Sequence, residues 1–187
     1  MDLENIKMRA KQLLNEGIPK RIDELQVTVS VLKKLESVKN PLNCNERDLV
    51  ELNNSLSAAL SAMVSFYYPV LLWISLLRPA MQAVESFQLH VQKTAIALLD
   101  DCDTNVKLCI NNTADYHVAR AKCIKRVHHN PHNLSYAHAL GYIGFQRVYA
   151  VMSTFEDLLH NLFMVNDFFK KNLSIIEEDN NNKNCFH

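Results

Sequence analysis

Apolar residues recur at steps of three and four positions along much of this chain, which predicts long amphipathic helices. The clearest run lies between residues 148 and 169, where the two steps alternate without a break. This spacing places every apolar side chain of the run on one side of an α-helix, as along the contact face of a coiled coil. The run consists of Val148, Val151, Phe155, Leu158, Leu162, Val165 and Phe169.

Three further helices are expected before that run. The first extends from about residue 3 to residue 38, with a kink or short break at Gly17–Pro19, because proline has no backbone N–H to donate. The second starts after Asn45, which can cap it, and stops at Pro79. The third covers about residues 91–127, and the small residues of its apolar stripe favour close helix approach. That stripe comprises Leu99, Cys102, Val106, Cys109, Thr113, Tyr116 and Cys123.

Polar connections separate these helices, at about residues 40–45, 79–89 and 128–133. Long helices joined by short loops form an up-down-up-down four-helix bundle, so we expect an all-α fold. Residues 1–175 are expected to form this bundle as a single domain. Residues 176–187 are rich in Asn and charged side chains, and we expect them to form a flexible polar C-terminal tail.

The second helix contains an uncharged stretch, from Leu52 to Leu77, that is long enough to cross a bilayer. Asn53, Asn54 and several serines lie within this stretch, and Pro69 stands near its middle. A helix that is apolar all round can instead be buried against a partner. We favour a partner subunit, because an isolated four-helix bundle buries one side of each helix. A membrane-associated helical protein is the alternative.

Composition excludes several function classes. The 20 Lys+Arg balance the 20 Asp+Glu, so no basic excess favours binding to nucleic acid. A chain with 3 Gly lacks the clustered glycines of a phosphate-binding loop and the turn residues of a β-rich fold. The 5 Cys have no CxxC spacing, and the charged N-terminus resembles no secretory signal, so we expect an intracellular, reducing location.

No group of residues in the sequence supports an enzyme. His128, His129 and His132 crowd one connection, but no Cys or carboxylate stands at ligand spacing beside them. The acidic residues of segment 100–103 are interpreted as a solvated helix face rather than as acid–base catalysts. We therefore expect no catalytic residue, no metal and no cofactor. A helical-bundle enzyme is a further alternative, and it would require a bound metal or cofactor.

Several short motifs occur in an order that is shared with a known family. Trp73–Pro79 resembles the Trp-Ile-x-x-Leu-x-Pro ending of the second helix in proteasome activator subunits of the 11S (REG) family. Residues 87–92 fall where that family has Phe-Gly-Val-x-Ile-Gln, and Pro131–Tyr136 fits its Pro-His-Val-x-x-Tyr. Near the N-terminus, Pro19–Leu25 resembles the family's Pro-Lys-Lys-x-x-Glu-Leu. The resemblance covers most of the chain.

This resemblance implies a non-enzymatic subunit of a heptameric ring that surrounds a pore and docks on the end of the proteasome core particle. The implied partners are that particle and further copies of the chain, without nucleic acid or membrane, in the cytoplasm or nucleus. In the family, C-terminal tails insert into pockets between core subunits, and several tails on one ring act as a multivalent ligand. The corresponding tail residues are Cys185, Phe186 and His187.

The family also opens the gate of the core particle with the loop between its second and third helices. The corresponding loop here consists of Val84, Glu85, Ser86, Phe87, Gln88 and Leu89. Val84 and Gln88 stand where the family has glycines, and both resist backbone conformations that glycine adopts. The loop could therefore continue as helix. A regulator that docks without opening the gate is the alternative to an activator.

Overall fold

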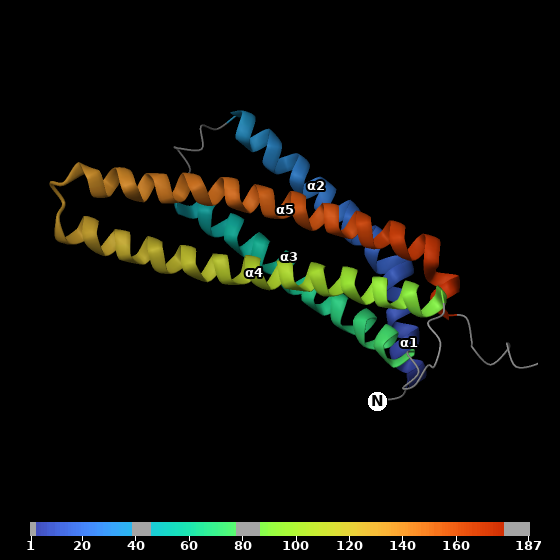
Figure 1. The fold of residues 1–187 in the computed structure, drawn as a ribbon. Coiled ribbons are helices and arrows are strands. Elements are labelled where there is room, and N and C mark those ends of the chain that lie inside the picture. Colours follow the sequence, from blue (N-terminus) through green and yellow to red (C-terminus); the bar gives the residue numbers. More distant parts are fainter. Residues whose placement is uncertain (1–2, 39–45, 78–86, 178–187) are drawn as a thin grey trace, which may run out of the picture.

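The computed structural model describes residues 3–38, 46–77 and 87–177, and these residues are helical except at one short turn. The expected all-α fold of long helices packed together is confirmed (Figure 1). The gaps fall on two of the expected connections and on the expected tail. The elements are α1 (Leu3–Gln12), the π-helical segment η1 (Leu13–Gly17), α2 (Ile18–Val38), α3 (Glu46–Leu77), α4 (Phe87–His129) and α5 (Leu134–Glu177).

The interruption expected in the first helix is a π-helical turn. In η1 the backbone N–H of Ile18 donates to the carbonyl of Leu13, five residues earlier. A π-helical turn holds one residue more than an α-helical turn, and it interrupts the regular hydrogen-bond ladder. The interruption ends at Gly17, two residues before Pro19, whose ring clashes with the preceding turn of a regular α-helix. The chain therefore passes from α1 to α2 without a loop.

The α4–α5 hairpin forms the long axis of the molecule, and the other helices pack along part of it (Figure 1). α3 lies against α4, α2 lies against α5, and α1 covers the later part of α3. The hairpin projects beyond the start of α3 and turns at residues 130–133. The backbone N–H of Asn133 closes this turn on the carbonyl of Asn130, at 3.1 Å.

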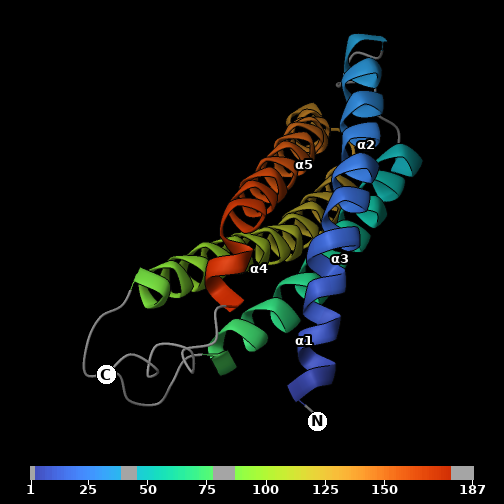
Figure 2. The ribbon, with the colours of Figure 1, turned by 90° about the vertical axis from the view of Figure 1, so that its right-hand side faces the viewer.

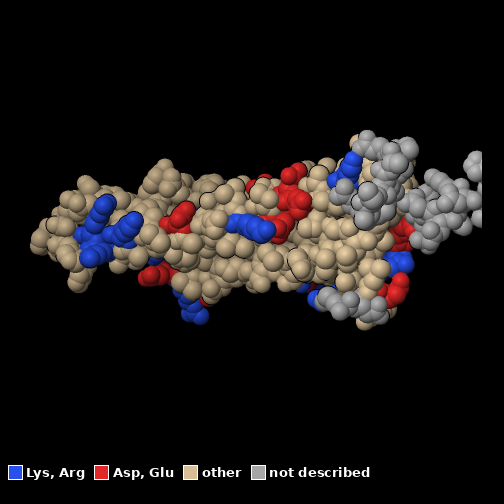
Figure 3. Space-filling model, turned by 60° about the horizontal axis from the view of Figure 1, so that its bottom comes forward, with Lys and Arg blue, Asp and Glu red and all other residues tan. Residues whose placement is uncertain are grey.

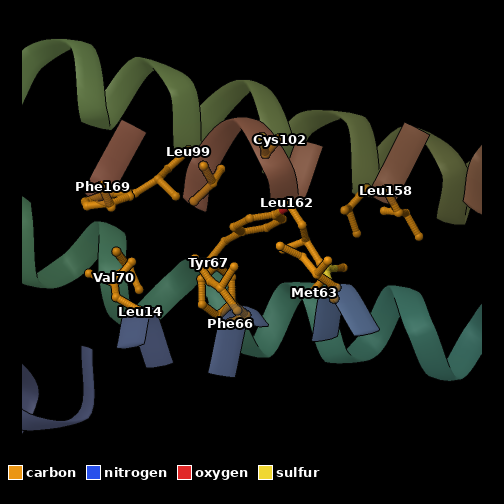
Figure 4. Close-up of a cluster of buried hydrophobic side chains, with 14 of the residues drawn as sticks. Leu14, Met63, Phe66, Tyr67, Val70, Leu99, Cys102, Leu158, Leu162 and Phe169 are labelled. Atoms are coloured by element: carbon orange, nitrogen blue, oxygen red, sulfur yellow. The ribbon is translucent and has the colours of Figure 1, made fainter. Parts of the chain in front are cut away.

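The apolar run of the fourth helix faces the core as expected. Six of its members are buried, whereas Val148 is half-buried. On α4, the small-residue stripe packs opposite, with Leu99 and Val106 fully buried. Aromatic and aliphatic side chains from α3 and from η1 fill the space between these stripes (Figure 4). The core is therefore continuous along the part of the hairpin that the other helices cover.

α3 is long and apolar enough to cross a membrane by length and composition, with a mean hydropathy of 1.7 over its most apolar window. Tyr67 and Trp73 are fully buried against the other helices, whereas Tyr68 and Leu76 of the same helix are 67% and 49% exposed. Its opposite face carries small residues such as Ser57, Ser61 and Ser65. The expectation of a helix that is apolar all round is therefore wrong along residues 57–65, and the bundle buries 39% of the most apolar window of α3.

Two helices are longer than the sequence pattern indicated. α4 begins at Phe87 rather than near Val91, and it ends at His129 rather than at Val127. The end of the expected junction and the start of the expected connection are therefore helical. α5 ends at Glu177, and the residues of the expected tail from 178 onward lie outside the described part of the chain.

Candidate functional site at one end of the bundle

The start of α4 and the end of α5 meet at one end of the bundle (Figure 2). The side-chain amide of Gln92 donates to the backbone carbonyl of Ile176 at 3.1 Å, and that of Gln88 reaches the same oxygen at 3.5 Å. Both glutamine side chains are buried. They satisfy a carbonyl that the last turn of a helix leaves without a partner. α4 therefore holds the C-terminal end of α5 in a fixed place.

α1 contacts the same point from another side. The Lys11 ammonium lies 2.7 Å from one oxygen of the Glu177 carboxylate, and it donates to the other oxygen at 2.8 Å. Both side chains are only partly exposed, which reduces the screening of this pair by water. The last residue of α5 is thus held by α1, and its neighbour Ile176 by α4. The chain beyond residue 177 starts from a defined position.

The structure describes half of the expected gate-contacting loop. Phe87, Gln88 and Leu89 form the first turn of α4, where Phe87 is 71% exposed, Gln88 is buried and Leu89 is half-buried. Val84, Glu85 and Ser86 lie outside the described residues, as do the expected docking residues Cys185, Phe186 and His187.

Sequence reasoning missed the residues that fix this end of the bundle. Gln88 and Gln92 are four positions apart, which places both on one face of a helix. That spacing was a usable signal once the helix was extended back to Phe87. Lys11 offered no such signal, because its partner Glu177 lies 166 positions away in the sequence.

Within the described part of the chain, the histidines of the hairpin turn are not grouped as metal ligands are. His128, His129 and His132 are exposed. A ring nitrogen of His129, Nδ1, lies 2.9 Å from the carbonyl oxygen of Lys125, one turn earlier in α4. Across residues 3–38, 46–77 and 87–177, no group of three or more His, Cys, Asp or Glu could hold a metal ion.

A buried polar cluster lies where α3, α4 and α5 meet. Arg147 donates through Nε to the Asn53 amide oxygen at 2.7 Å and through Nη2 to the Thr113 hydroxyl at 2.9 Å. Its guanidinium carbon lies 4.8 Å from the centre of the Tyr116 ring. Burial lowers the pKa of Arg147, because the charged form is poorly solvated there. These contacts link three helices, and we assign them a structural role.

Comparisons with known proteins agree on one family. The family profile described as "Proteasome activator PA28, C-terminal" matches residues 41–185. Proteasome activator complex subunit 3 of Homo sapiens and that of Mus musculus are each 19% identical to this chain over 158 residues. Each alignment covers 84% of this chain and 62% of the relative, so the chain spans less than two thirds of these curated relatives.

A solved structure has the same fold. The crystal structure of the 11S subunit of the Plasmodium falciparum proteasome, PA28, superposes on this chain with a TM-score of 0.81. The superposition covers 93% of this chain and 90% of that chain, at 18% sequence identity. At this identity the match establishes the arrangement of helices alone.

Proposed function

The chain belongs to the PA28 family of proteasome activators, as its motifs indicated, and from that premise we propose that it is a non-enzymatic subunit of a ring that docks on the proteasome core particle. The observation that carries this proposal is the meeting of α4, α5 and α1 at one end of the bundle. The segments before Phe87 and after Glu177 both leave the described structure at that end (Figure 2). These are the two segments to which the family resemblance assigned gate contact and docking.

Docking through the tail is supported by the way its origin is held. Gln92 and Lys11 fix the last turn of α5, so the ten residues that follow start from the same place in every copy. A tail with a fixed origin loses less freedom on binding than one that leaves a frayed helix. One tail binds weakly, but several tails on one ring act together. We propose Cys185, Phe186 and His187 as the docking residues.

Ring formation is supported by exposed apolar side chains on α4 and α5. Burial of such side chains against a neighbouring copy would remove apolar surface from water, which favours association. We propose that further copies of the chain cover it in a closed ring, of seven copies by family resemblance. We expect cytoplasmic or nuclear location, with neither a nucleic-acid nor a membrane partner. The exposed apolar side chains outside the hairpin tip are Leu108, Ile110, Tyr149, Phe163 and Met164.

Deleting Cys185–His187 tests the proposal directly. We expect the full chain to raise hydrolysis of short fluorogenic peptides by purified core particle, and the deletion to abolish the increase. The matched control deletes Asn180–Asn182, which shortens the tail by the same amount and keeps its last residues. Unchanged stimulation after removal of Cys185–His187 would refute docking through the tail.

A second candidate function is docking without gate opening. The observation that favours it is the helical state of Phe87–Leu89, with Gln88 buried against the end of α5. A segment held in this way adopts extended loop conformations less easily than one with glycines. The expected result is co-sedimentation with core particle without stimulation. Restoring glycines by Val84→Gly and Gln88→Gly should then produce stimulation, and failure to do so would exclude the loop as the cause.

A further inference from the structure

The projecting end of the α4–α5 hairpin, residues 116–142, has a distinctive charge. From Tyr116 to Phe155 the sequence contains five Lys or Arg, five His and no Asp or Glu, although the whole chain has 20 Asp+Glu. The formal net charge of the chain is zero, so the remainder carries an equal negative excess. The molecule is therefore electrically polar along its length, with the positive end at this tip.

Three of these cations are available to a ligand. Lys122, Lys125 and Arg126 are exposed, and Figure 3 shows blue side chains gathered at this end of the molecule. Within the described residues, the ion pair that links the tip to α3 is made by Arg120, whose Nη2 lies 3.3 Å from Glu46. The acidic start of α3 thus compensates Arg120 and leaves the three cations beyond it. Such a cluster attracts a negatively charged partner over about 8 Å at physiological salt.

Apolar side chains of the same tip are exposed as well. Val118, Ile124, Leu134 and Tyr142 are 52%, 42%, 70% and 56% exposed. An open depression of about 600 Å³ lies at the turn and is lined by residues 129–135. A nucleic-acid backbone has little use for exposed aliphatic groups, because its contacts are dominated by phosphate. A polypeptide can match both, with carboxylates for the cations and apolar side chains for the rest.

We propose that the tip is a docking surface for an acidic polypeptide segment that also carries apolar side chains. The surface lies at the opposite end of the bundle from Phe87 and Glu177, and it therefore goes beyond the proposed docking on the core particle (Figure 1). Binding at the tip needs one chain only. In the proposed ring, neighbouring tips would raise the affinity further, because a bound segment can reach the next copy.

Fluorescence anisotropy of the full chain tests this proposal in the absence of core particle. The probe is a labelled peptide of alternating Glu and Leu pairs, and the variant is Lys122→Glu/Lys125→Glu/Arg126→Glu. We expect binding by the parent chain that weakens as salt rises, and about tenfold weaker binding by the variant. The matched control is Arg9→Glu/Lys20→Glu/Lys170→Glu, which reverses three exposed cations elsewhere and should retain most of the affinity.

A second variant tests the apolar part of the surface. Val118→Ser/Leu134→Ser should weaken binding of the Glu/Leu peptide and leave binding of a poly-Glu peptide unchanged, because Val118 lies one helical turn before Lys122. Circular dichroism checks that each variant is folded. If the triple variant is unfolded, the single variant Lys125→Glu is measured in its place. The proposal is overturned if the parent chain does not bind, or if the control variant loses as much affinity. If a single-stranded oligonucleotide of equal charge binds more tightly than the peptide, the tip binds nucleic acid and the proposal is overturned.

The readout separates this proposal from the preceding one. Peptide binding at the tip is measured on the chain alone, whereas docking is measured as stimulation or co-sedimentation of core particle. A tip variant that loses the peptide should still act on the core particle as the parent chain does. Loss of both activities in a folded tip variant would contradict the assignment of two separate ends.

Discussion

At the scale of single residues, Tyr67 and Cys102 illustrate how the core discourages charge. The two side chains lie next to each other between α3 and α4 (Figure 4). Burial raises the pKa of Tyr67 far above its ordinary value of 10.0, and the neighbouring thiol adds to this effect. Burial also raises the pKa of Cys102 above 9.0. Both groups therefore stay neutral in the folded chain at a pH where they ionise in the unfolded chain.

The sign of the resulting pH dependence follows from linkage. A raised folded-state pKa contributes stability that is complete below the unfolded pKa and is lost as pH rises above it. We expect the free energy of unfolding to fall above about pH 9, by up to about 1.4 kcal/mol per pH unit for each group. Tyr67→Phe should flatten the fall above pH 10 and change stability at neutral pH by less than about 1 kcal/mol, because the buried Tyr67 hydroxyl has no hydrogen-bond partner among the described residues.

Denaturant unfolding at a series of pH values measures this effect. The matched control is Tyr68→Phe, since Tyr68 is the next residue and is 67% exposed. Tyr68→Phe should leave the pH dependence as it is. An unchanged slope above pH 10 in Tyr67→Phe would show that Tyr67 does not cause the alkaline loss.

At the scale of elements, the π-helical segment η1 has the properties of a one-residue insertion. Removing one residue from it should convert the turn to α-helix and leave the buried positions of α1 and α2 in register. Removing a residue from regular helix instead rotates everything before it by about 100°, which moves Ile6 and Leu14 out of the core. The two kinds of deletion should therefore differ strongly in cost.

Deletion of Glu16 removes a residue from η1, and deletion of Glu24 removes one from the regular helix α2. Both residues are exposed, so neither deletion removes a core side chain directly. Both deletions are made with Pro19→Ala, so that the proline ring does not clash with a regular helix. We expect deletion of Glu16 to cost less than about 2 kcal/mol and deletion of Glu24 to cost at least about 3 kcal/mol, which is typical of lost core side chains. Thermal unfolding measures the difference. Equal costs would contradict the insertion interpretation.

The helices themselves were predictable from sequence, because their apolar positions repeat at helical spacing. The run on α5 and the stripe on α4 both face the core. The exposed side of α3 was expected to be apolar. A few serines change the mean hydropathy of a long segment little, but at spacings of four residues they lie together on one face of the helix. The π-helical geometry was also beyond the sequence, because proline signals an interruption without specifying its form.

The candidate site was predictable only in part. The family motif at residues 87–92 placed Phe87 in the expected gate-contacting segment, because that motif is local in sequence. The docking role of Cys185–His187 stays a prediction. The hydrogen bonds from Gln88 and Gln92 to Ile176 join positions more than 80 residues apart. Such long-range pairs leave no periodic signal in one sequence, so they required the folded arrangement.

At the scale of the whole molecule, we expect the chain to exist as a ring in solution. One chain has a mass of 21.5 kDa, so seven copies give roughly 150 kDa. Light scattering coupled to size-exclusion chromatography measures this mass. Covering the exposed apolar side chains of α4 and α5 supplies the driving force. A stable monomer at micromolar concentration would remove the basis for a ring and, with it, for docking by several tails.

The 44 residues of α5 run from the hairpin turn to Glu177, and at 1.5 Å per residue they measure about 66 Å. No break interrupts the helix within that length. The length of α5 therefore sets a distance. An extended polypeptide with one end bound at the hairpin tip needs roughly 20 residues to reach the level of Glu177. A shorter extended chain bound at the proposed tip surface would not reach Glu177 at the same time.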